Sequence, residues 1–528
     1  MKLLIPILLV YSLPVGQALA LQIRNYSSAR HDRFTGFSSA PVANASFMHG
    51  GVDLTGVGWD STYVLRQFTL VSPRHFVGAN HFRPPIGAAI RFVSADGTVR
   101  SSTVQSLSTI PNAGGQATDL LVGRLSTPFL PASGVRFLPC HLLDTEAAYI
   151  GQTLGVLGQP ARGGRGIIAG FVDFGGDPIT GGSGINTTRT MQFTYSNLTG
   201  SADDAYAESG DSGSPSFVVV NGRAAVAGTH TAVLNAAGTV TTFDTFLPAY
   251  LAQVNAVMEA DGYHLTAAAP KTTTLMLTQQ VTPAIPRAGY PVTIQFTLTN
   301  TGALFAANNV RLDTALTGAP VITPAGSSGW VFDAVAGGTQ ARRGGLGAGA
   351  GSQVSLSFTP AGAGTIPRTM TWSADEALPQ STGATITVLE SFKSWSAGLA
   401  DPSPGGDSDG DGVDNLMEYS QGGNPGKSSR TVDGSTALMG LAAAGALTGA
   451  EGNRQIVRFV RRTDAANRLL AYTLETSMTN SSPWNDVTTA AVILQVTPIS
   501  PGLEIVEMAL PATTSARQFA RLIVTLSE

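Results

Sequence analysis

Gly210-Asp211-Ser212-Gly213-Ser214-Pro215 is the stretch that decides how this 528-residue chain is interpreted. Glycines on both sides of Ser212 permit a tight turn that directs the serine hydroxyl outward. The same turn would expose the backbone N–H groups of Gly210 and Ser212, which together can stabilise an oxyanion. A serine hydroxyl becomes an effective nucleophile only when a neighbouring base removes its proton. The stretch therefore predicts a nucleophile loop whose base and acid lie elsewhere in the chain.

Two further segments supply a base and an acid. Residues 71–82 form a short apolar strand that is followed by small residues and His81, and residues 117–125 place Asp119 directly before an apolar run. Histidine suits the role of base because its unperturbed pKa lies near neutrality. His81 would take the proton of Ser212, and Asp119 would accept the other ring N–H and hold the imidazole in the required tautomer.

The order His81, Asp119, Ser212, with the residues around each, resembles the chymotrypsin-type serine proteases. That resemblance implies two successive six-stranded barrels with the active site between them, and peptide hydrolysis through an acyl-enzyme. His75 lies inside the apolar strand, where a packed side chain is expected. A serine esterase fits less well, because its Gly-x-Ser-x-Gly turn needs glycine where this chain has Ser214.

Three residues are candidates for the S1 pocket, which would hold the substrate side chain before the cleaved bond. Trypsin-like members of the family carry aspartate six residues before the nucleophile, and here that residue is Tyr206, which disfavours cleavage after Arg or Lys. His230 lies in a segment that resembles the pocket wall of bacterial glutamyl endopeptidases, where a histidine pairs with a substrate carboxylate. Ser209 is compatible with that pattern, whereas Glu208 would oppose an acidic substrate. An acidic P1 residue and a small or aliphatic one both remain open.

The aspartate before the nucleophile, Asp211, raises the question of activation. Animal members of the family insert a newly cut N-terminus, usually Ile-Val-Gly-Gly, against this aspartate. The chain has no such motif, and residues 49–52 are only a faint match. Some bacterial relatives instead pair the aspartate with an internal arginine, which is the alternative expected here.

The N-terminus reads as a secretory signal. Residues 1–20 combine a basic start, an apolar run too short to span a bilayer, and the cleavage site Ala18-Leu19-Ala20. Residues 21–40 are polar and predict a propeptide or a disordered lead. Cys140 is the only cysteine, so no intramolecular disulfide is possible, whereas secreted animal proteases of this class usually carry several. A bacterial product that is secreted, or held at the cell surface through its C-terminal domains, is therefore expected, with Cys140 buried.

Composition favours an all-β protein, because the chain has 61 glycines, many Thr and Val residues and few helical patterns. The net charge is −4 and no basic run occurs, which argues against nucleic acid or anionic membranes as partners. The predicted organisation is a double-barrel protease domain, a linker, an Ig-like β-sandwich, a calcium-binding loop segment and a small C-terminal β domain, over residues 41–263, 264–274, 275–389, 390–430 and 431–528 respectively. The protease domain should close with a helix over residues 248–258.

The calcium prediction rests on Asp407-Ser-Asp409-Gly-Asp411-Gly412-Val413-Asp-Asn415-Leu-Met-Glu418, which matches the EF-hand loop at every defined position. The predicted ligands are the side chains of Asp407, Asp409, Asp411, Asn415 and Glu418 and the carbonyl of Val413. Prolines in residues 401–406 exclude an entering helix. The segment therefore resembles dockerin-like or thrombospondin type 3-like loops, in which calcium is a structural brace.

Two functions from different classes follow from these residues. The first is a secreted serine endopeptidase acting on protein or peptide substrates. The second is a surface adhesion or scaffold protein whose protease-like domain has no useful turnover. The complete set of His81, Asp119 and Ser212 favours the first.

Overall fold

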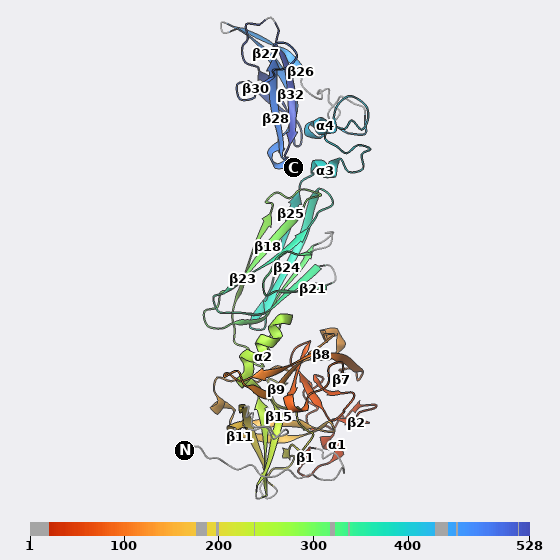
Figure 1. Cartoon of the computed structure of the whole chain (residues 1–528), viewed down its shortest axis with the longest axis vertical. Coiled ribbons are helices and arrows are strands. Elements are labelled where there is room, and N and C mark those ends of the chain that lie inside the picture. The colour runs from red at the N-terminus through yellow and green to blue at the C-terminus, as the bar shows by residue number, and fades with distance from the viewer. Residues whose placement is uncertain are drawn as a thin grey trace.

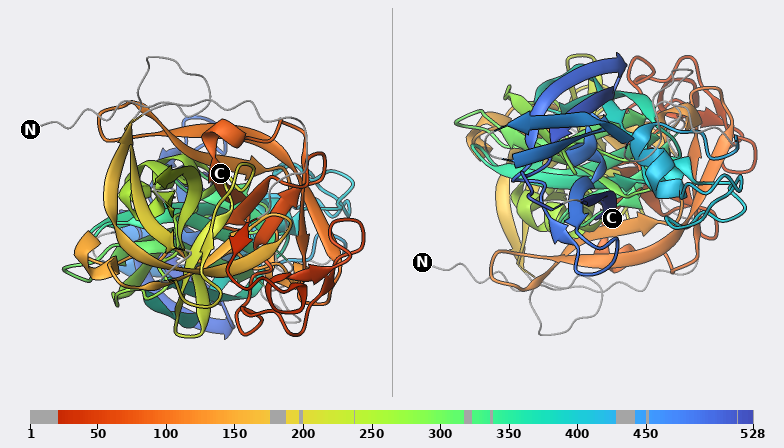
Figure 2. Two further views of the ribbon diagram at one scale, coloured as in Figure 1. Left: turned by 90° about the horizontal axis from the view of Figure 1, so that it is seen from below. Right: turned by 90° about the horizontal axis from the view of Figure 1, so that it is seen from above.

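The computed structural model describes residues 21–175, 187–196, 200–236, 238–316, 323–335, 338–427, 442–449, 452–515 and 517–527. The predicted signal segment, residues 1–20, and the start of the predicted C-terminal domain, residues 431–441, lie outside these ranges. Three globular parts follow one another along the long axis in chain order (Figure 1), and they overlap when the molecule is seen along that axis (Figure 2). Strands build all three parts and the helices are short, so the predicted all-β class is confirmed.

The first barrel is closed, with strand order β4-β5-β6-β9-β8-β7. These strands are β4 (Val57–Asp60), β5 (Gln67–Leu70), β6 (His75–Ala79), β7 (Ala89–Val93), β8 (Val99–Pro111) and β9 (Ala117–Leu125). Phe68, Phe76 and Phe92 are buried in its interior. Gly123 makes room for this packing, because a β-carbon there would overlap the ring of Phe76.

The second barrel is also closed, with order β10-β11-β12-β16-β15-β14, which confirms the predicted pair of six-stranded barrels. Its strands are β10 (Thr153–Gly158), β11 (Arg162–Gly175), β12 (Thr187–Ser196), β14 (Pro215–Val220), β15 (Arg223–Ala236) and β16 (Thr239–Phe246). The helix expected at residues 248–258 is a 3-10 turn, η4 (Leu247–Tyr250), followed by α2 (Leu251–Met258). Val254 and Met258 pack against Cys140, which is buried as expected, and burial raises the pKa of its thiol.

Residues 21–40 are folded against the barrels, so the disordered alternative predicted for them is wrong. Leu21 is buried, and β1 (Gln22–Ile23) pairs with β13 (Ala205–Tyr206). In the short helix α1 (Ser28–His31), Arg30 and His31 contact the two oxygens of Asp203 at 2.7 and 3.0 Å. The strands β2 (Phe34–Thr35) and β3 (Val42–Ala43) then form a small hairpin. Leu21 and Ile23 belong to the core of the second barrel, so this segment is part of the domain.

The middle part is a β-sandwich with one shared core. Its four-stranded sheet has the order β17-β18-β23-β20, and its five-stranded sheet has the order β21-β22-β19-β24-β25. The strands are β17 (Leu275–Thr282), β18 (Val292–Asn300), β19 (Ala307–Leu316), β20 (Thr323–Pro324), β21 (Val331–Val335), β22 (Gly338–Leu346), β23 (Gly351–Phe358), β24 (Gly364–Ala374) and β25 (Ala377–Val388). The alternating segment at residues 292–299 buries every second residue, as a strand on a core does.

Residues 264–274, expected to be a linker, are bound on both sides. The backbone N–H of Cys140 donates to the carbonyl of Thr266 at 2.8 Å, and the N–H of His264 donates to the Asn309 side chain at 2.9 Å. Arg342 of the sandwich donates to the carbonyl of Asp261 at 2.5 Å. The double barrel and the sandwich therefore meet in a hydrogen-bonded contact and not through a free chain.

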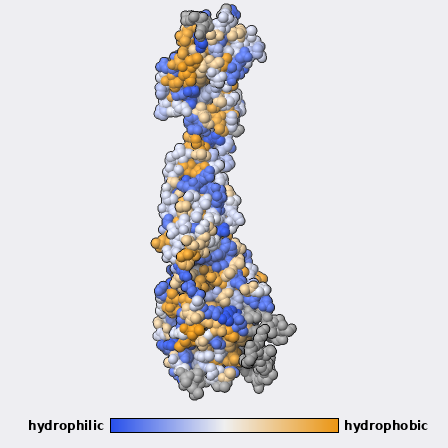
Figure 3. All heavy atoms as spheres, turned by 90° about the vertical axis from the view of Figure 1, so that its left-hand side faces the viewer, coloured by the Kyte–Doolittle hydropathy of each residue, from blue (hydrophilic) through white to orange (hydrophobic). Residues whose placement is uncertain are grey.

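The C-terminal part begins with α3 (Phe392–Trp395) and α4 (Asn415–Gln421), whose aromatic residues Trp395 and Tyr419 lie 5.5 Å apart between ring centroids. Two sheets follow, with orders β26-β27-β31-β30 and β29-β28-β32. The strands are β26 (Ala442–Gly449), β27 (Gly452–Arg462), β28 (Leu470–Ser477), β29 (Asn485–Asp486), β30 (Val492–Ser500), β31 (Leu503–Ala509) and β32 (Phe519–Leu526). The edge strand β30 exposes Val492, Ile493 and Leu494, and hydrophobic atoms gather on this part of the surface (Figure 3).

Within the part of the chain that the structure describes, every helix is too short or too polar to cross a membrane.

Candidate active site

His81, Asp119 and Ser212 meet where the two barrels face each other. His81 lies in η1 (Asn80–Phe82), immediately after β6, and Asp119 lies near the beginning of β9. The antiparallel register pairs Ala79 with Leu120, so both side chains emerge at the same end of the first barrel. Ser212 is in the loop that precedes β14 of the second barrel. The three residues singled out from the sequence are therefore brought together by the fold.

The three side chains form a continuous hydrogen-bonded triad. His81 Nδ1 lies 2.8 and 2.9 Å from the two carboxylate oxygens of Asp119, and His81 Nε2 lies 2.8 Å from Ser212 Oγ. The backbone N–H of His81 also donates to Asp119 Oδ1 at 2.9 Å, which fixes the ring relative to the carboxylate. Since Asp119 accepts the proton on Nδ1, Nε2 is left as the acceptor that faces the serine hydroxyl.

Thr231 is a further member of the site that the sequence analysis missed. Its Oγ1 donates a hydrogen bond to Asp119 Oδ2, and it comes from β15 of the second barrel. The contact therefore ties the acid of one barrel to a strand of the other. The available signal in the sequence was a hydroxyl residue directly after His230.

The nucleophile loop leaves two backbone donors available beside Ser212. Gly210 and Gly213 have φ values of 100° and 85°, which glycine adopts readily and other residues do not. Gly213 donates to the carbonyl of His230 at 2.9 Å, and Ser214 donates to that of Asp211 at 3.0 Å, so the turn is anchored. Among the described residues, the N–H groups of Gly210 and Ser212 have no hydrogen-bond acceptor. They are suited to bind the oxyanion of a tetrahedral intermediate.

Asp211 is buried and is not paired with an arginine in the described part of the chain, so the arginine alternative is wrong. Its two carboxylate oxygens accept the backbone N–H groups of Gln159 at 2.7 Å and Glu208 at 2.8 Å. Burial raises the pKa of Asp211 to about 7. A carboxylate in this position lacks the full counter-charge that would keep it ionised.

Leu21 lies next to Asp211, with Gly158 between them. A β-carbon on Gly158 would lie 2.7 Å from Asp211 Oδ1 and 2.9 Å from the β-carbon of Leu21. The backbone N–H of Leu21 donates to the carbonyl of Gln159 at 3.1 Å. The residue that follows the predicted cleavage site and the aspartate of the nucleophile loop therefore lie on either side of Gly158.

His230 does not occupy the place predicted for it. Its side chain is only 2% exposed; Nδ1 lies 2.5 Å from Asp244 Oδ1, and Nε2 lies 2.8 Å from the carbonyl oxygen of Leu157. Burial opposes the charge on His230, but Asp244, Asp211 and the carbonyl of Leu157 together outweigh it, and the pKa of His230 is raised. Because both ring nitrogens are engaged inside the second barrel, His230 cannot hold a substrate carboxylate in this structure, and that prediction is wrong.

Tyr206 and Ser209 remain close to the nucleophile loop. Tyr206 packs its ring 4.9 Å from that of Tyr195, and burial raises the pKa of Tyr206 to about 12. Ser209 is exposed, and its carbonyl accepts the side-chain amide of Gln159 at 3.1 Å. Burial also raises the pKa of Glu208, which follows Tyr206 after one residue. Among the described residues, neither Tyr206 nor Ser209 is a hydrogen-bond partner of the His230 ring, whose partners are Asp244 and Leu157.

The predicted calcium loop gathers its acidic residues. Asp407, Asp409 and Asp411 each offer an oxygen within 4.8 Å of the others. Backbone N–H groups of Gly410 and Gly412 donate to Asp407 at 2.9 Å and curl the loop around it.

Buried oxygens at the end of this loop have no hydrogen-bond donor among the described residues, namely both carboxylate oxygens of Glu418 and Oδ1 of Asn415. Asn415 Nδ2 donates to the carbonyls of Asp401 and Ser403, which leaves its oxygen for another partner. Burial, followed by the charge of Asp409, raises the pKa of Glu418 to about 7. An all-oxygen set with unpartnered buried acceptors fits a hard cation such as Ca²⁺.

No protein-family model and no curated protein matches this chain. Solved structures similar to it include two from Vibrio cholerae. These are the secreted serine protease VesC (13% identity, 89% of this chain and 95% of that one, TM-score 0.26) and the VesB protease (13% identity, 63% and 94%, TM-score 0.26). A mutant of human heparin binding protein is also similar (14% identity, 40% and 94%, TM-score 0.30). The chain's own two closed six-stranded barrels, with the hydrogen-bonded triad between them, define an all-β, chymotrypsin-like fold.

Proposed function

We propose that the protein is a secreted serine endopeptidase that hydrolyses peptide bonds through an acyl-enzyme on Ser212. The observation that supports this function is the unbroken chain from Ser212 Oγ through the His81 ring to Asp119, with each link at 2.8–2.9 Å. The available N–H groups of Gly210 and Ser212 lie in the same turn as the nucleophile.

In the first half of the reaction, Ser212 Oγ attacks the carbonyl carbon of the peptide bond while His81 Nε2 accepts the hydroxyl proton. The carbonyl oxygen becomes an oxyanion that the N–H groups of Gly210 and Ser212 would bind. Asp119 stabilises the imidazolium, which then gives its proton to the leaving amine as the C–N bond breaks. In the second half, His81 deprotonates a water molecule that attacks the ester, and the proton returns to Ser212 as the acid product leaves.

For specificity, we propose a small or aliphatic P1 residue. The acidic alternative depended on His230 as the partner of a substrate carboxylate, and His230 is bound to Asp244 and Leu157. Glu208, next to Ser209, would also repel an acidic side chain.

For activation, we propose that removal of residues 1–20 completes the site. Cleavage after Ala20 would give Leu21 a free ammonium group, which has three donors where an amide has one. One donor can keep the bond to the Gln159 carbonyl, and another would point toward Asp211, which lies on the other side of Gly158. Such a pair would supply the counter-charge that the buried Asp211 carboxylate lacks and would hold the nucleophile loop in place.

For the C-terminal loop, we propose a structural calcium ion. The side chains of Asp407, Asp409, Asp411, Asn415 and Glu418 and the carbonyl of Val413 would hold it. The ion would neutralise the gathered carboxylates and brace α4 against α3, next to the C-terminal sheets. It would take no part in peptide hydrolysis.

The test of the proposed function uses the mature protein and its Ser212→Ala variant. Labelling by a fluorophosphonate, which reacts with activated serines, and cutting of a diverse peptide pool are both expected for the wild type and not for the variant. Cuts after small or aliphatic residues would support the specificity. Absence of both labelling and cutting in a correctly processed protein would favour the adhesion or scaffold function.

A further inference from the structure

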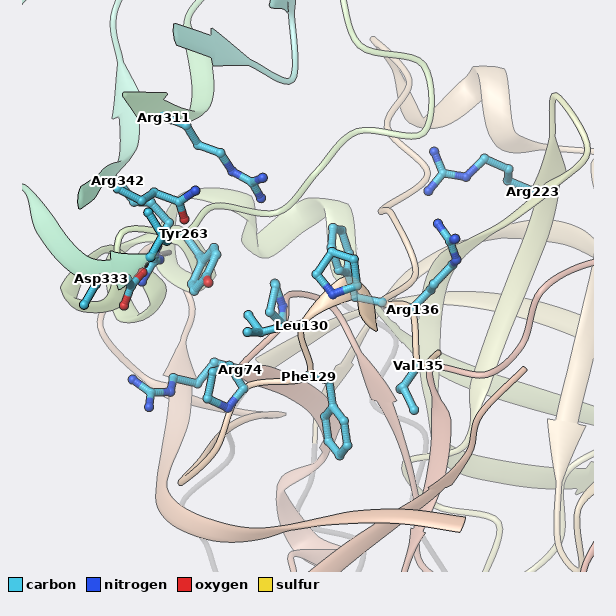
Figure 4. Close-up of a pocket in the computed structure, with 17 residues that line it drawn as sticks. Arg74, Phe129, Leu130, Val135, Arg136, Arg223, Tyr263, Arg311, Asp333 and Arg342 are labelled. Carbon is cyan, nitrogen blue, oxygen red and sulfur yellow. Dashed lines mark hydrogen bonds and ion pairs between the residues drawn. The ribbon is translucent and has the colours of Figure 1, made fainter. Parts of the chain in front are cut away.

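A cavity of about 620 Å³ lies where the first barrel meets the sandwich (Figure 4). The barrel side contributes Pro73 and Arg74 before β6 and residues 128–131 and 135–137 after β9. The sandwich side contributes residues of β19, β21 and β22, among them Arg311 and Arg342. The cavity therefore exists only because the two domains are joined, and it belongs to neither alone.

The lining is strongly cationic. Five arginines and one aspartate line the cavity, a net charge of +4, whereas the whole chain carries −4. Two of the arginines are already paired. Arg342 Nε lies 2.7 Å from Asp333 Oδ2, and Arg74 lies 3.2 Å from Asp261 Oδ1.

The other three arginines, Arg136, Arg223 and Arg311, have exposed side chains and almost no partners. Arg136 has one long contact, 3.8 Å to Asp53, and among the described residues neither Arg223 nor Arg311 makes a hydrogen bond or an ion pair. Figure 4 shows Arg311 entering the cavity from the sandwich, opposite Arg136 and Arg223 on the barrel side.

Asp375 is a partly buried carboxylate that feels the charges of Arg311 and Arg223, but it forms no ion pair with either among the described residues. Its Oδ2 is bonded to Asn309 at 2.6 Å and to Thr266 at 2.9 Å. Three like charges gathered from three separate elements repel one another, so an anionic ligand would be bound favourably there. Guanidinium groups also suit carboxylates, because they donate two parallel hydrogen bonds.

Most of the other lining residues are apolar, the exceptions being Gln340 and Tyr263. Pro73, Pro128, Pro131, Leu130 and Phe137 line the barrel side, and Leu130 is 58% exposed. A ligand that matches this surface combines carboxylates with apolar side chains. A peptide segment meets both requirements, whereas a sulfated sugar chain offers little to bury against Leu130.

The cavity is remote from the triad, although the strands β6 and β9 connect the two. His81 and Asp119 lie at one end of these strands and cavity residues lie beyond the other end. Arg74 precedes β6 and His81 follows it, so roughly seven residues at about 3.3 Å each separate them, a distance of about 20 Å. In β9, which is antiparallel to β6, Asp119 lies near the beginning and residues 128–131 follow its end. A peptide of two or three residues in the active site is too short to span this distance, whereas a protein substrate is long enough.

We propose that this cavity is an exosite that binds an acidic, partly apolar peptide segment of protein substrates. Its role in substrate capture rests on the proposed peptidase function, but its binding of an acidic peptide does not. The two ideas are separable, because binding is measured on the full-length Ser212→Ala protein, in which no turnover is needed.

The test is fluorescence anisotropy with a labelled peptide of Glu, Asp and Leu residues and a matched peptide of Gln, Asn and Leu. The test variant is Arg136→Gln/Arg223→Gln/Arg311→Gln. The control is Arg91→Gln/Arg458→Gln/Arg517→Gln, which removes the same charge from exposed positions outside the cavity. The affinity of the acidic peptide for the test variant is expected to be at least about tenfold lower than for the parent. Its affinity for the control variant should equal that for the parent.

Equal binding to the test and control variants would overturn the proposal, since the attraction would then come from overall charge alone. Equal affinity for the acidic and neutral peptides would also overturn it. A sulfated polysaccharide that bound the cavity where the acidic peptide did not would replace the peptide assignment by a glycan. In the active parent, loss of protein cleavage with normal cleavage of short peptides in the test variant would link the exosite to capture.

Discussion

The proposed ion pair between a free amino group on Leu21 and Asp211 predicts a stability difference between two forms of the protein that differ only at the N-terminus. One form begins at Leu21 with a free amino group, and the other carries a short Gly-Ser extension before it. Both are made with Ser212→Ala, so that self-cleavage does not interfere. In the extended form Asp211 keeps only its backbone donors, and burial holds its pKa at about 7.

The magnitude follows from this pKa. An aspartate in the unfolded chain has a pKa of about 3.9, so the folded state raises it by roughly three units at about 1.36 kcal/mol each. Because the folded pKa is the higher one, the folded state binds the proton more tightly. The stability that the group contributes is therefore present below about pH 4 and is lost as the pH rises toward 7. At neutral pH, the extended form should lose about 4 kcal/mol relative to its stability in acid from this group.

An ammonium group at Leu21 would offset that loss. The form that begins at Leu21 should be more stable by up to about 4 kcal/mol near pH 7, and the two forms should converge only below about pH 4, where Asp211 becomes protonated in both. Urea unfolding across this pH range measures the difference directly. If the two forms followed the same stability curve from pH 4 to pH 7, the ion pair would not exist and the activation proposal would fall.

Three other substitutions test separate parts of the structure. Asp119→Asn should lower kcat by a factor on the order of 10⁴ without unfolding the protein, because the imidazole would lose its oriented tautomer; peptide hydrolysis and circular dichroism together check this. His230→Gln should leave the P1 preference unchanged and destabilise the protein by about 3 kcal/mol, since it removes the partner of the buried Asp244; a changed P1 preference would restore the acidic-substrate hypothesis. Glu418→Gln should abolish a Ca²⁺-dependent rise in melting temperature of several degrees in the C-terminal part, as measured by calorimetry. Because the pKa of Glu418 is raised to about 7, calcium affinity of the unaltered loop should fall as the pH drops through that value.

Features that depend on neighbouring residues were predictable from the sequence. The turn at Ser212 needs glycine at Gly210 and Gly213, and both φ values are indeed positive. The strands beside His81 and Asp119 are continuous runs of mostly apolar residues. The sequence alone therefore predicted that His81 follows one strand and that Asp119 precedes the apolar part of the other. The alternation at residues 292–299 likewise located a buried strand of the sandwich.

Features that depend on distant partners were not predictable. Residues 21–40 contain few apolar side chains and therefore looked polar. Two of these side chains, Leu21 and Ile23, nevertheless belong to the core of the second barrel, whose other residues lie at position 149 and beyond in the sequence. His230 looked like a substrate ligand because its true partner was hidden in the sequence. Asp244 lies opposite His230 only because of the register between β15 and β16, which the sequence does not reveal. The contact of Thr231 with Asp119 was not predictable, because the two residues belong to different barrels.

The sequence by itself determined the chemistry of the chain: an all-β protein with a histidine, an aspartate and a serine in an order suited to acyl transfer, and an acidic loop suited to calcium. These properties are local, because turn glycines, strand alternation and ligand spacing act over a few residues. Only the tertiary structure decided which charges meet. It buried Asp211 close to Leu21, bound His230 to Asp244, and gathered arginines separated by up to 268 positions, from Arg74 to Arg342, around one cavity. Electrostatic energy depends on distance and burial, and neither quantity is set until the domains have packed.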